Sequence, residues 1–251
     1  MKLSKEENMD ELIYGRNACL EALNTGKVEE LYIQKGNLKG SIEKVIGRAK
    51  NKNVIIKTVD KKTLDNMAKG EVHQGVIASI SSFEYSSVED ILNEAKKREE
   101  DPFIVILDEI EDPHNLGAII RSCETAGVHG VIIPKRRSAS INSTVYKSSA
   151  GACNYLKVAK VTNINRTIDE LKEKNIFVYG TDGDAKSYYN KTNLTGPIAI
   201  VIGNEGKGIS MQVKKNCDDL IKIPMRGKIT SLNASNACAV VCYEVLRQRD
   251  V

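Results

Sequence analysis

The chain has 251 residues, of which 41% are hydrophobic and 28% are charged. Its 37 Lys and Arg residues against 33 Asp and Glu residues give a net charge of +4. This length and composition are typical of globular proteins with one large or two modest domains. The longest uninterrupted apolar run, at residues 237–243, is too short to span a bilayer. The charged N-terminus lacks the apolar core of a signal peptide. The six cysteines have no C-x-x-C spacing, and they fit neither a zinc ribbon nor a disulfide framework. We therefore expect a cytoplasmic protein with reduced thiols, no membrane segment and no bound metal.

The first eighty residues alternate strand and helix patterns. Their composition predicts a helix at residues 41–50 and strands at residues 28–34, 54–59 and 75–80. Ile42, Val45 and Ile46 would form the buried face of the helix. We therefore predict a small α/β domain over residues 1–80.

A polar, serine-rich connector at residues 81–87 leads into a charged helix at residues 88–100, for which Ser87 is a suitable N-cap. We assign residues 81–101 to this linker and connecting helix, and residues 102–251 to a second domain. That domain contains apolar runs typical of buried parallel strands, at residues 103–107, 131–133, 176–179, 198–202 and 220–223. Helical crossovers between such strands predict an α/β sheet that is covered on both faces.

The segment from Asp112 to Gly127 directly follows the first of these strands. Asn115 is placed to cap a helix that has an apolar face and ends at the glycine. Arg121 lies off that face but near the start of the helix, where a cation opposes the helix dipole. Both side chains thus lie near the carboxyl end of a strand, where open α/β sheets bind ligands. Capping alone would explain Asn115, but it does not explain Arg121.

Two further polar segments follow strands. Residues 202–210, Ile-Gly-Asn-Glu-Gly-Lys-Gly-Ile-Ser, contain three glycines that allow the backbone to approach a ligand closely, but their spacing fits neither a P-loop nor a dinucleotide-binding fingerprint. An ordinary turn explains this segment about as well. In the other segment, Ser231, Asn233 and Ser235 crowd the predicted start of a helix with more polar groups than one cap requires. The alternative interpretation is that these three side chains only cap the helix and bind no ligand.

Acidic residues are absent from residues 125–168, a run of 44 positions. The same run contains seven basic residues, Lys135, Arg136, Arg137, Lys147, Lys157, Lys160 and Arg166. This concentration of positive charge fits binding to the phosphate backbone of a nucleic acid, because each neutralised phosphate releases bound counterions. A solvated basic face without a partner is the alternative.

The three polar segments, in this order and each after a strand, resemble the SpoU/TrmH branch of the SPOUT RNA methyltransferases. Residues 115–121, Asn-Leu-Gly-Ala-Ile-Ile-Arg, are similar to the family's first motif, and residues 203–209, Gly-Asn-Glu-Gly-Lys-Gly-Ile, to its second. Ile-Pro-Met-x-Gly from residue 223 and Ser-Leu-Asn-Ala-Ser from residue 231 are similar to the third, in which Ala234 and Asn236 stand where valine is usual. Residues 13–23 and 73–76 resemble the L30e-like RNA-binding domain of bacterial 23S rRNA guanosine 2′-O-methyltransferases.

This resemblance implies a catalytic α/β domain with a mostly parallel sheet and a deep trefoil knot, preceded by a small L30e-like α/β domain. It also implies a homodimer that transfers a methyl group from S-adenosylmethionine to a ribose 2′-hydroxyl in RNA, most closely that of a guanosine in 23S rRNA. Two alternatives stay open. One is a tRNA ribose 2′-O-methyltransferase, and the other is a catalytically silent RNA-binding protein of ribosome assembly.

The resemblance further implies roles for individual residues. Catalysis would require Arg121, with Asn115, Asn233 and Glu205 orienting the arginine and the ribose. The cofactor would contact six residues: Gly203, Ile223, Leu232, Thr181, Asn204 and Ser231. RNA would contact Lys135, Arg136 and Arg137 in the second domain and Arg16 and His73 in the first. His114 adjoins the site, but the family pattern does not require a histidine there.

Overall fold

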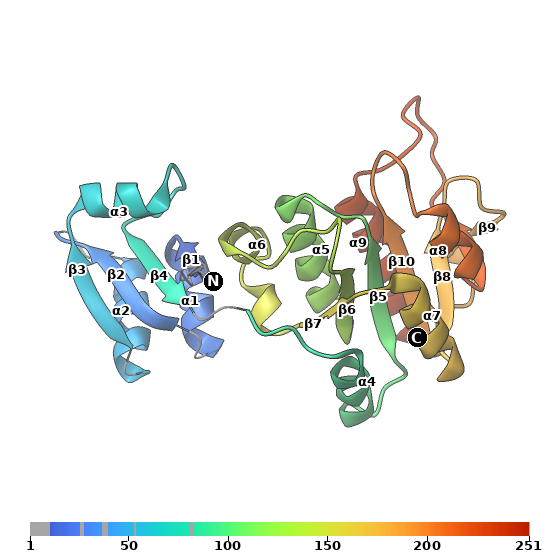
Figure 1. Cartoon of the computed structure of the whole chain (residues 1–251), viewed down its shortest axis with the longest axis horizontal. Helices are drawn as coiled ribbons and strands as arrows, with labels where there is room; N and C mark the ends of the chain where they lie inside the picture. The colour runs from blue at the N-terminus through green and yellow to red at the C-terminus, as the bar shows by residue number, and fades with distance from the viewer. Residues whose placement is uncertain (1–10, 26–27, 37–39, 53, 81–82, 251) are drawn as a thin grey trace, which may run out of the picture. The chain divides into compact units, whose positions relative to one another are not determined.

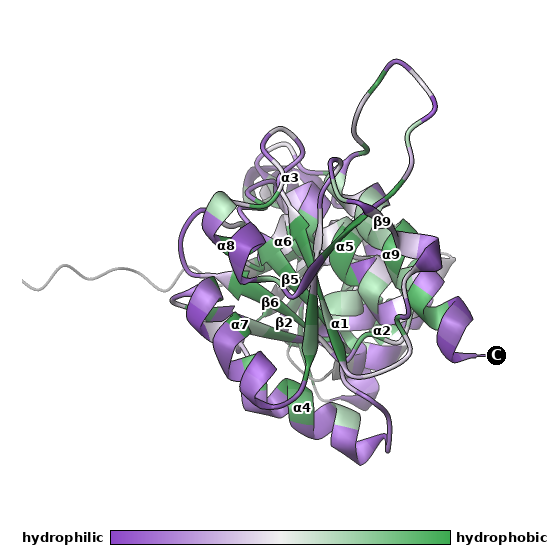
Figure 2. Ribbon diagram, turned by 90° about the vertical axis from the view of Figure 1, so that its right-hand side faces the viewer, coloured by the Kyte–Doolittle hydropathy of each residue, from purple (hydrophilic) through white to green (hydrophobic). Residues whose placement is uncertain are grey.

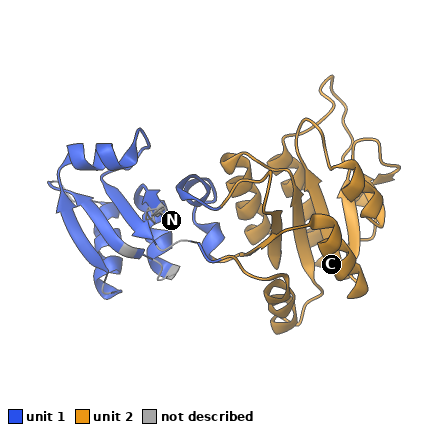
Figure 3. Cartoon of the chain, viewed as in Figure 1, with its two compact units in different colours: residues 1–84, 141–154 blue, residues 85–140, 155–251 orange. Residues whose placement is uncertain are grey.

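The computed structural model describes residues 11–25, 28–36, 40–52, 54–80 and 83–250, which form two compact units (Figures 1 and 3). Unit 1 contains the described parts of residues 1–84 together with residues 141–154, and unit 2 contains residues 85–140 and 155–250. The predicted α/β class is confirmed in both units. The predicted domain limits at residues 80 and 101 stay predictions, and no signal in the sequence indicated that residues 141–154 belong to unit 1.

Unit 1 is built on a four-stranded mixed sheet in the order β1-β4-β2-β3. Its strands are β1 (Glu11–Tyr14), β2 (Val28–Gln34), β3 (Ile55–Val59) and β4 (Val76–Ile80), and its helices are α1 (Arg16–Thr25), α2 (Ser41–Asn51), α3 (Lys61–Ala68), α6 (Ser143–Ser148) and the 3-10 helix η1 (Ala152–Asn154). Strand β2 pairs parallel with β3, whereas β4 runs antiparallel to both β1 and β2. The three strands and the helix predicted for this part of the chain are confirmed.

Residues 141–154 pack into unit 1 through a glycine and a buried aromatic ring. Gly151 has a φ of +87°, and a Cβ on it would lie 2.4 Å from the Cβ of Glu21 on α1. The ring of Tyr146 on α6 is fully buried and meets Phe83 edge to face, with ring centroids 6.4 Å apart. The close approach of Gly151 to Glu21 and the burial of the Tyr146 ring therefore attach this segment to unit 1.

Unit 2 is built on a seven-stranded sheet in which every pairing is parallel, in the order β7-β6-β5-β10-β8-β11-β9. The strands are β5 (Phe103–Asp108), β6 (Gly130–Pro134), β7 (Lys157–Val161), β8 (Phe177–Thr181), β9 (Ser187–Tyr188), β10 (Ile198–Gly203) and β11 (Asp219–Lys222). The helices are α4 (Val88–Lys97), α5 (Pro113–Thr125), α7 (Ile164–Glu173), α8 (Met211–Asn216), α9 (Ala234–Arg249) and the 3-10 helix η2 (Tyr189–Lys191). All five strands predicted for the second domain are confirmed, whereas β7 and β9 were not predicted.

Helices cover both faces of this sheet (Figure 2). On one face, apolar side chains of α4, α7 and α8 form a continuous core with alternate residues of β5, β6, β8 and β10. On the other face, α5 and α9 pack against each other, next to β6 and β10. All six residues of β5 and of β10 are buried, which explains why residues 103–107 and 198–202 are uniformly apolar instead of alternating.

The start of α4 carries a complete capping box, as predicted for Ser87. Its hydroxyl accepts from the backbone N–H of Asp90 at 3.1 Å, and the Asp90 carboxylate accepts from the backbone N–H of Ser87 at 2.8 Å. The hydrogen bonds from Ser87 lower the pKa of Asp90. The helix ends at Lys97, three residues before the predicted end.

Replacing Ser87 by alanine is expected to lower the free energy of unfolding by about 1 kcal/mol, because one backbone donor in the first turn loses its acceptor. Urea unfolding followed by circular dichroism measures this change. Ser187→Ala, at the half-buried first residue of β9, is the matched serine control, because its hydroxyl caps no helix and donates only a long hydrogen bond of 3.4 Å to Asp219. An unchanged denaturation midpoint for Ser87→Ala would show that the box contributes nothing to stability.

Candidate active site

The chain continues from β8, β10 and β11 into loops that line a cavity of about 1220 Å³. Parallel strands present their carboxyl ends at the same edge of the sheet, so these three loops meet there. The cavity lining includes all six residues predicted to contact a cofactor, Thr181, Gly203, Asn204, Ile223, Ser231 and Leu232. The loops therefore bring together residues that are up to 51 positions apart in the sequence.

The loop after β10 is a tight turn, and its first residue, Gly203, has no room for a Cβ. Gly203 is buried, and a Cβ on it would lie 2.1 Å from the carbonyl carbon of Gly208 and 2.2 Å from the amide nitrogen of Ile209. The backbones of Asn204 and Gly208 exchange two hydrogen bonds, of 3.1 and 2.7 Å, and Gly208 has a φ of +68°. Gly203 and Gly208 thus allow the turn to close.

Two of the predicted cofactor neighbours have side chains engaged within the protein. The Thr181 hydroxyl donates to the carbonyl of Val201 at 2.9 Å. The Asn204 amide donates to the carbonyl of Glu109 at 3.3 Å and accepts from the backbone N–H of Gly206 at 2.9 Å. These hydrogen bonds hold the two side chains in the walls of the cavity, which both residues line.

Asn115, Glu205 and Asn233 form one hydrogen-bonded network. The same oxygen of Glu205 accepts from the Nδ2 of Asn115 at 2.6 Å and from the Nδ2 of Asn233 at 2.5 Å, and Asn233 also donates to the Oδ1 of Asn115 at 3.0 Å. Three residues from three separate motifs therefore meet at the wall of the cavity, which Glu205 itself lines.

The expectation that Asn115 caps its helix is wrong. The helix α5 begins two residues earlier, at Pro113, and its N-cap is Asp112, whose side chain accepts from the backbone N–H of His114 at 2.9 Å. Proline at the first helical position is common because its missing donor is not needed there. Asn115 consequently lies inside the first turn, where its side chain is free to reach Glu205. At the start of α9 the opposite holds, because Asn233 is the N-cap of that helix and its side chain accepts from the backbone N–H of Ser235 at 2.9 Å.

Arg121 lies outside this network. It is exposed on α5, and within the described chain its guanidinium has no hydrogen bond or ion pair. A helix turns by about 100° per residue, so a spacing of six residues separates Arg121 from Asn115 by about 120° around the axis and about 9 Å along it. The structure therefore brings together three of the four predicted catalytic residues and leaves the arginine available to a ligand.

For the methyl transfer to RNA that the resemblance of the sequence implies, Glu205→Ala is expected to lower the rate by about 100-fold, because both amides lose the acceptor that orients them. Glu205→Gln should lose less, since both hydrogen bonds end on one oxygen and a glutamine amide oxygen can still accept them, although without the negative charge. Steady-state rates of transfer from labelled S-adenosylmethionine measure both variants, with exposed Glu173→Ala on α7 as the control. Equal rates for Glu205→Ala and the natural protein would remove this residue from the site.

The structure also adds residues to the cavity that the sequence did not indicate. Asp182 directly follows Thr181 at the end of β8, lines the cavity and forms an ion pair with Lys214 of α8. Tyr188 of β9 also lines the cavity, and the Nζ of Lys222 lies 5.0 Å from its ring centroid. Asp182 could have been found in the same way as Asn115, because it is a polar residue that follows a buried strand. Nothing in the sequence pointed to Tyr188.

The predicted RNA-contacting residues of unit 2 are exposed, but they are not equivalent. Arg137 has a φ of +55° and forms a 2.7 Å ion pair with Glu109, which raises the pKa of the guanidinium. Lys135 and Arg136 are exposed, and neither has an ion pair within the described chain. Of the three charges, two are therefore available to phosphate without the loss of an existing contact.

In unit 1, Arg16 and His73 line a separate cavity of about 930 Å³. The buried ring of His73 accepts from the backbone N–H of Gly75 at 3.0 Å through Nδ1, so that its Nε2 carries the proton and donates to Asp65 at 2.9 Å. Arg16 donates to the carbonyl of Gln74 at 3.1 Å and to the hydroxyl of Ser41 at 3.2 Å. The histidine is thus committed to internal contacts, whereas Arg16 is half-buried at the wall of the cavity.

Sequence comparison finds two families along the chain. Residues 102–243 match the family described as the SpoU rRNA Methylase family, and residues 12–86 match the domain described as RNA 2′-O ribose methyltransferase substrate binding. The Bacillus subtilis protein YacO is 45% identical over 239 residues, which cover 95% of this chain and 96% of YacO. The name of that protein describes it as a TrmH family tRNA/rRNA methyltransferase.

Solved structures agree with this assignment. The SpoU methyltransferase AviRb from Streptomyces viridochromogenes, crystallised with S-adenosylmethionine, is 26% identical and superposes with a TM-score of 0.79 over 95% of this chain and 90% of its own. The TrmH/SpoU tRNA-modifying enzyme of A. aeolicus is 29% identical and superposes with a TM-score of 0.55, over 64% of this chain and 84% of its own. Within the described residues, no helix combines the length and apolar character that crossing a bilayer requires.

Proposed function

The chain belongs to the SpoU rRNA methylase family, and from this premise we propose that it transfers a methyl group from S-adenosylmethionine to the 2′-hydroxyl of a guanosine ribose in 23S rRNA. The observation that carries the proposal is the network of Asn115, Glu205 and Asn233 at the wall of a cavity formed by three strand-end loops. These residues come from the three motifs of the family, in the arrangement that one site requires.

The residues of the cavity fit S-adenosylmethionine. Its volume of about 1220 Å³ accommodates a ligand of nucleoside size, and its lining combines apolar side chains such as Ile223 and Leu232 with loop backbone and the carboxylate of Asp182. We assign Gly203, Ile223 and Leu232 to contacts with the cofactor through their backbone, with Thr181, Asn204 and Ser231 beside them. When bound, the cofactor supplies an electrophilic methyl group.

The protein's own contribution is to place and activate the ribose hydroxyl, which is a poor nucleophile at neutral pH. Arg121 cannot act as a base, because a guanidinium stays protonated. We assign to it a bidentate contact with the adjacent phosphate and stabilisation of the developing alkoxide, while phosphate or water accepts the proton. The network of Asn115, Asn233 and Glu205 would orient the ribose at the wall of the cavity.

Two observations favour rRNA over tRNA as the substrate. Unit 1 matches a substrate-binding domain, and the tRNA-modifying enzyme of A. aeolicus superposes on only 64% of this chain. We also propose a cytoplasmic homodimer, and sedimentation equilibrium across a range of protein concentrations tests the dimer.

The substrate is tested by transfer of a labelled methyl group to unmodified 23S rRNA, 16S rRNA and bulk tRNA, followed by digestion and identification of the nucleoside. We expect 2′-O-methylguanosine from 23S rRNA. Methylated tRNA would keep the chemistry and overturn the substrate. No transfer to any RNA, with the cofactor still bound, would favour a precursor particle as the substrate, and failure to bind the cofactor would favour a silent assembly protein.

For RNA binding, we expect Arg136→Ala to reduce the slope of log affinity against log salt by about 1, because one phosphate contact is lost. Arg137→Ala should change the slope less, since that side chain is already paired with Glu109. Filter binding at several salt concentrations measures both variants. A larger effect at Arg137 than at Arg136 would mean that RNA displaces the internal ion pair.

A further inference from the structure

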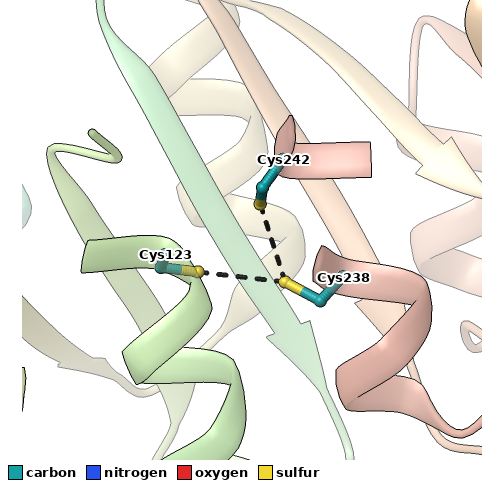
Figure 4. Close-up of side chains that lie close together, drawn as sticks. All are labelled: Cys123, Cys238 and Cys242. Carbon is teal, nitrogen blue, oxygen red and sulfur yellow. Dashed lines mark hydrogen bonds between the residues drawn. The ribbon is translucent and has the colours of Figure 1, made fainter. Parts of the chain in front are cut away.

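Three cysteine side chains meet in the core of unit 2 between α5 and α9 (Figure 4). The sulfur of Cys238 lies 3.8 Å from the sulfur of Cys123 and 3.8 Å from that of Cys242, and all three sulfurs lie within 4.8 Å of one another. Cys238 and Cys242 are one helical turn apart on α9 and so point to the same side, where Cys123 of α5 faces them. All three side chains are fully buried.

The arrangement of the sulfurs has the dimensions of a metal site. A metal–sulfur bond of about 2.3 Å, the length found in zinc thiolates, places three sulfurs around a central ion about 4 Å apart. Small side-chain rotations would therefore admit one ion at the centre of the cluster without movement of either helix. A disulfide requires two sulfurs at about 2.05 Å, and its formation would leave the third thiol unused.

The number and kind of ligands select the metal. Structural zinc sites and iron–sulfur clusters both take four protein ligands, whereas among the described residues this group contains three. Soft sulfur ligands favour Cu(I), which has no demand for a fourth ligand. We propose that Cys123, Cys238 and Cys242 form a three-coordinate site for one Cu(I) ion.

The ligand of a metal ion is the thiolate rather than the thiol, so binding of Cu(I) releases protons. Three copper–sulfur bonds form, the S–H bonds of the three thiols break and their protons pass to solvent, and the bonds that hold the ion to its donor in solution break. Copper stays in its cuprous state, so no electron is transferred.

The site would connect the two helices that carry the residues of the candidate active site. Cys123 lies two residues after Arg121 on α5, and Cys238 lies five residues after the N-cap Asn233 of α9. A ligand that binds only the folded state stabilises it by mass action. Bound Cu(I) should therefore raise the thermal unfolding temperature, and this effect does not depend on the proposed methyl transfer.

The test is an anaerobic titration of the full chain with Cu(I) in the presence of a colorimetric Cu(I) chelator. We expect one copper per chain to be withheld from the chelator, and the copper X-ray absorption spectrum of that complex to show three sulfur neighbours. Copper that is fully surrendered to the chelator would overturn the proposal, and so would a spectrum dominated by nitrogen or oxygen neighbours. Zinc that is retained as strongly as copper in a parallel titration would overturn the assignment to Cu(I).

Variants locate the site. Cys238→Ala removes the central sulfur and should lower the affinity for Cu(I) by at least about tenfold, and Cys242→Ala should do the same by leaving only two ligands. Cys217→Ala is the matched control, because Cys217 is the least buried of the six cysteines and lies outside the cluster. Thermal unfolding without copper establishes that each variant is folded. Retention of copper by folded Cys238→Ala, or its loss in Cys217→Ala, would overturn the site.

Discussion

Replacing Arg121 by lysine is expected to lower methyl transfer to RNA by about 100-fold or more, which is the usual cost of losing one group that stabilises charge in a transition state. Lysine keeps the positive charge, but it offers a point charge instead of a planar fork. It cannot donate two parallel hydrogen bonds to a phosphate while it also faces the developing alkoxide.

The structure makes this substitution a clean test. Arg121 is exposed on α5 and has no internal partner within the described chain, so its replacement leaves the network of Asn115, Glu205 and Asn233 intact. We therefore expect an unchanged unfolding temperature and unchanged binding of S-adenosylmethionine, with the loss confined to turnover on RNA.

The control is Arg166→Lys on α7, because that side chain is 80% exposed and pairs with Glu170 one turn later. Single-turnover transfer from labelled S-adenosylmethionine measures the chemical step in both variants. A rate for Arg121→Lys equal to that of the natural protein would remove the bidentate contact from the mechanism. Loss of cofactor binding in the same variant would place the arginine at the cofactor instead.

The strands of unit 2 were predictable from the sequence because their signal is local. Residues 103–107 and 198–202 are uniformly apolar, and such a run is typical of a strand that is buried on both faces. The position of the site followed from the same signal, since polar residues after buried strands collect at one edge of a parallel sheet. Both inferences need only residues that are adjacent in the chain.

Features that depend on distant contacts could not be predicted in this way. Cys123 and Cys238 are 115 residues apart and meet only because α5 and α9 pack together. Residues 141–154 join unit 1 through contacts with residues such as Glu21, more than 100 positions earlier. The wrong assignment of the cap to Asn115 has another cause. Asp112 and Asn115 are both good N-caps, and Pro113 between them decided the choice.

Replacing Gly203 by alanine is expected to abolish most binding of S-adenosylmethionine. The added Cβ would lie 2.1 Å from the carbonyl carbon of Gly208 and 2.2 Å from the amide nitrogen of Ile209, and both are backbone atoms that cannot rotate away. The turn that joins Asn204 to Gly208 must then open, and overpacking of this kind costs about 1–3 kcal/mol. Each 1.4 kcal/mol corresponds to a factor of about ten in affinity, so we expect a loss of about tenfold to hundredfold.

Gly206→Ala in the same loop is the matched control. A Cβ at that position would meet only the Asn204 Oδ1, at an ordinary distance of 3.5 Å, so this variant should bind the cofactor normally. Isothermal titration with S-adenosylmethionine measures both variants, and thermal unfolding shows whether each is folded. Equal affinities for folded Gly203→Ala and Gly206→Ala would mean that the turn after β10 does not shape the cofactor site. A loss restricted to Gly203→Ala would instead show that the approach of Gly203 to Gly208 holds the wall of the cavity in place.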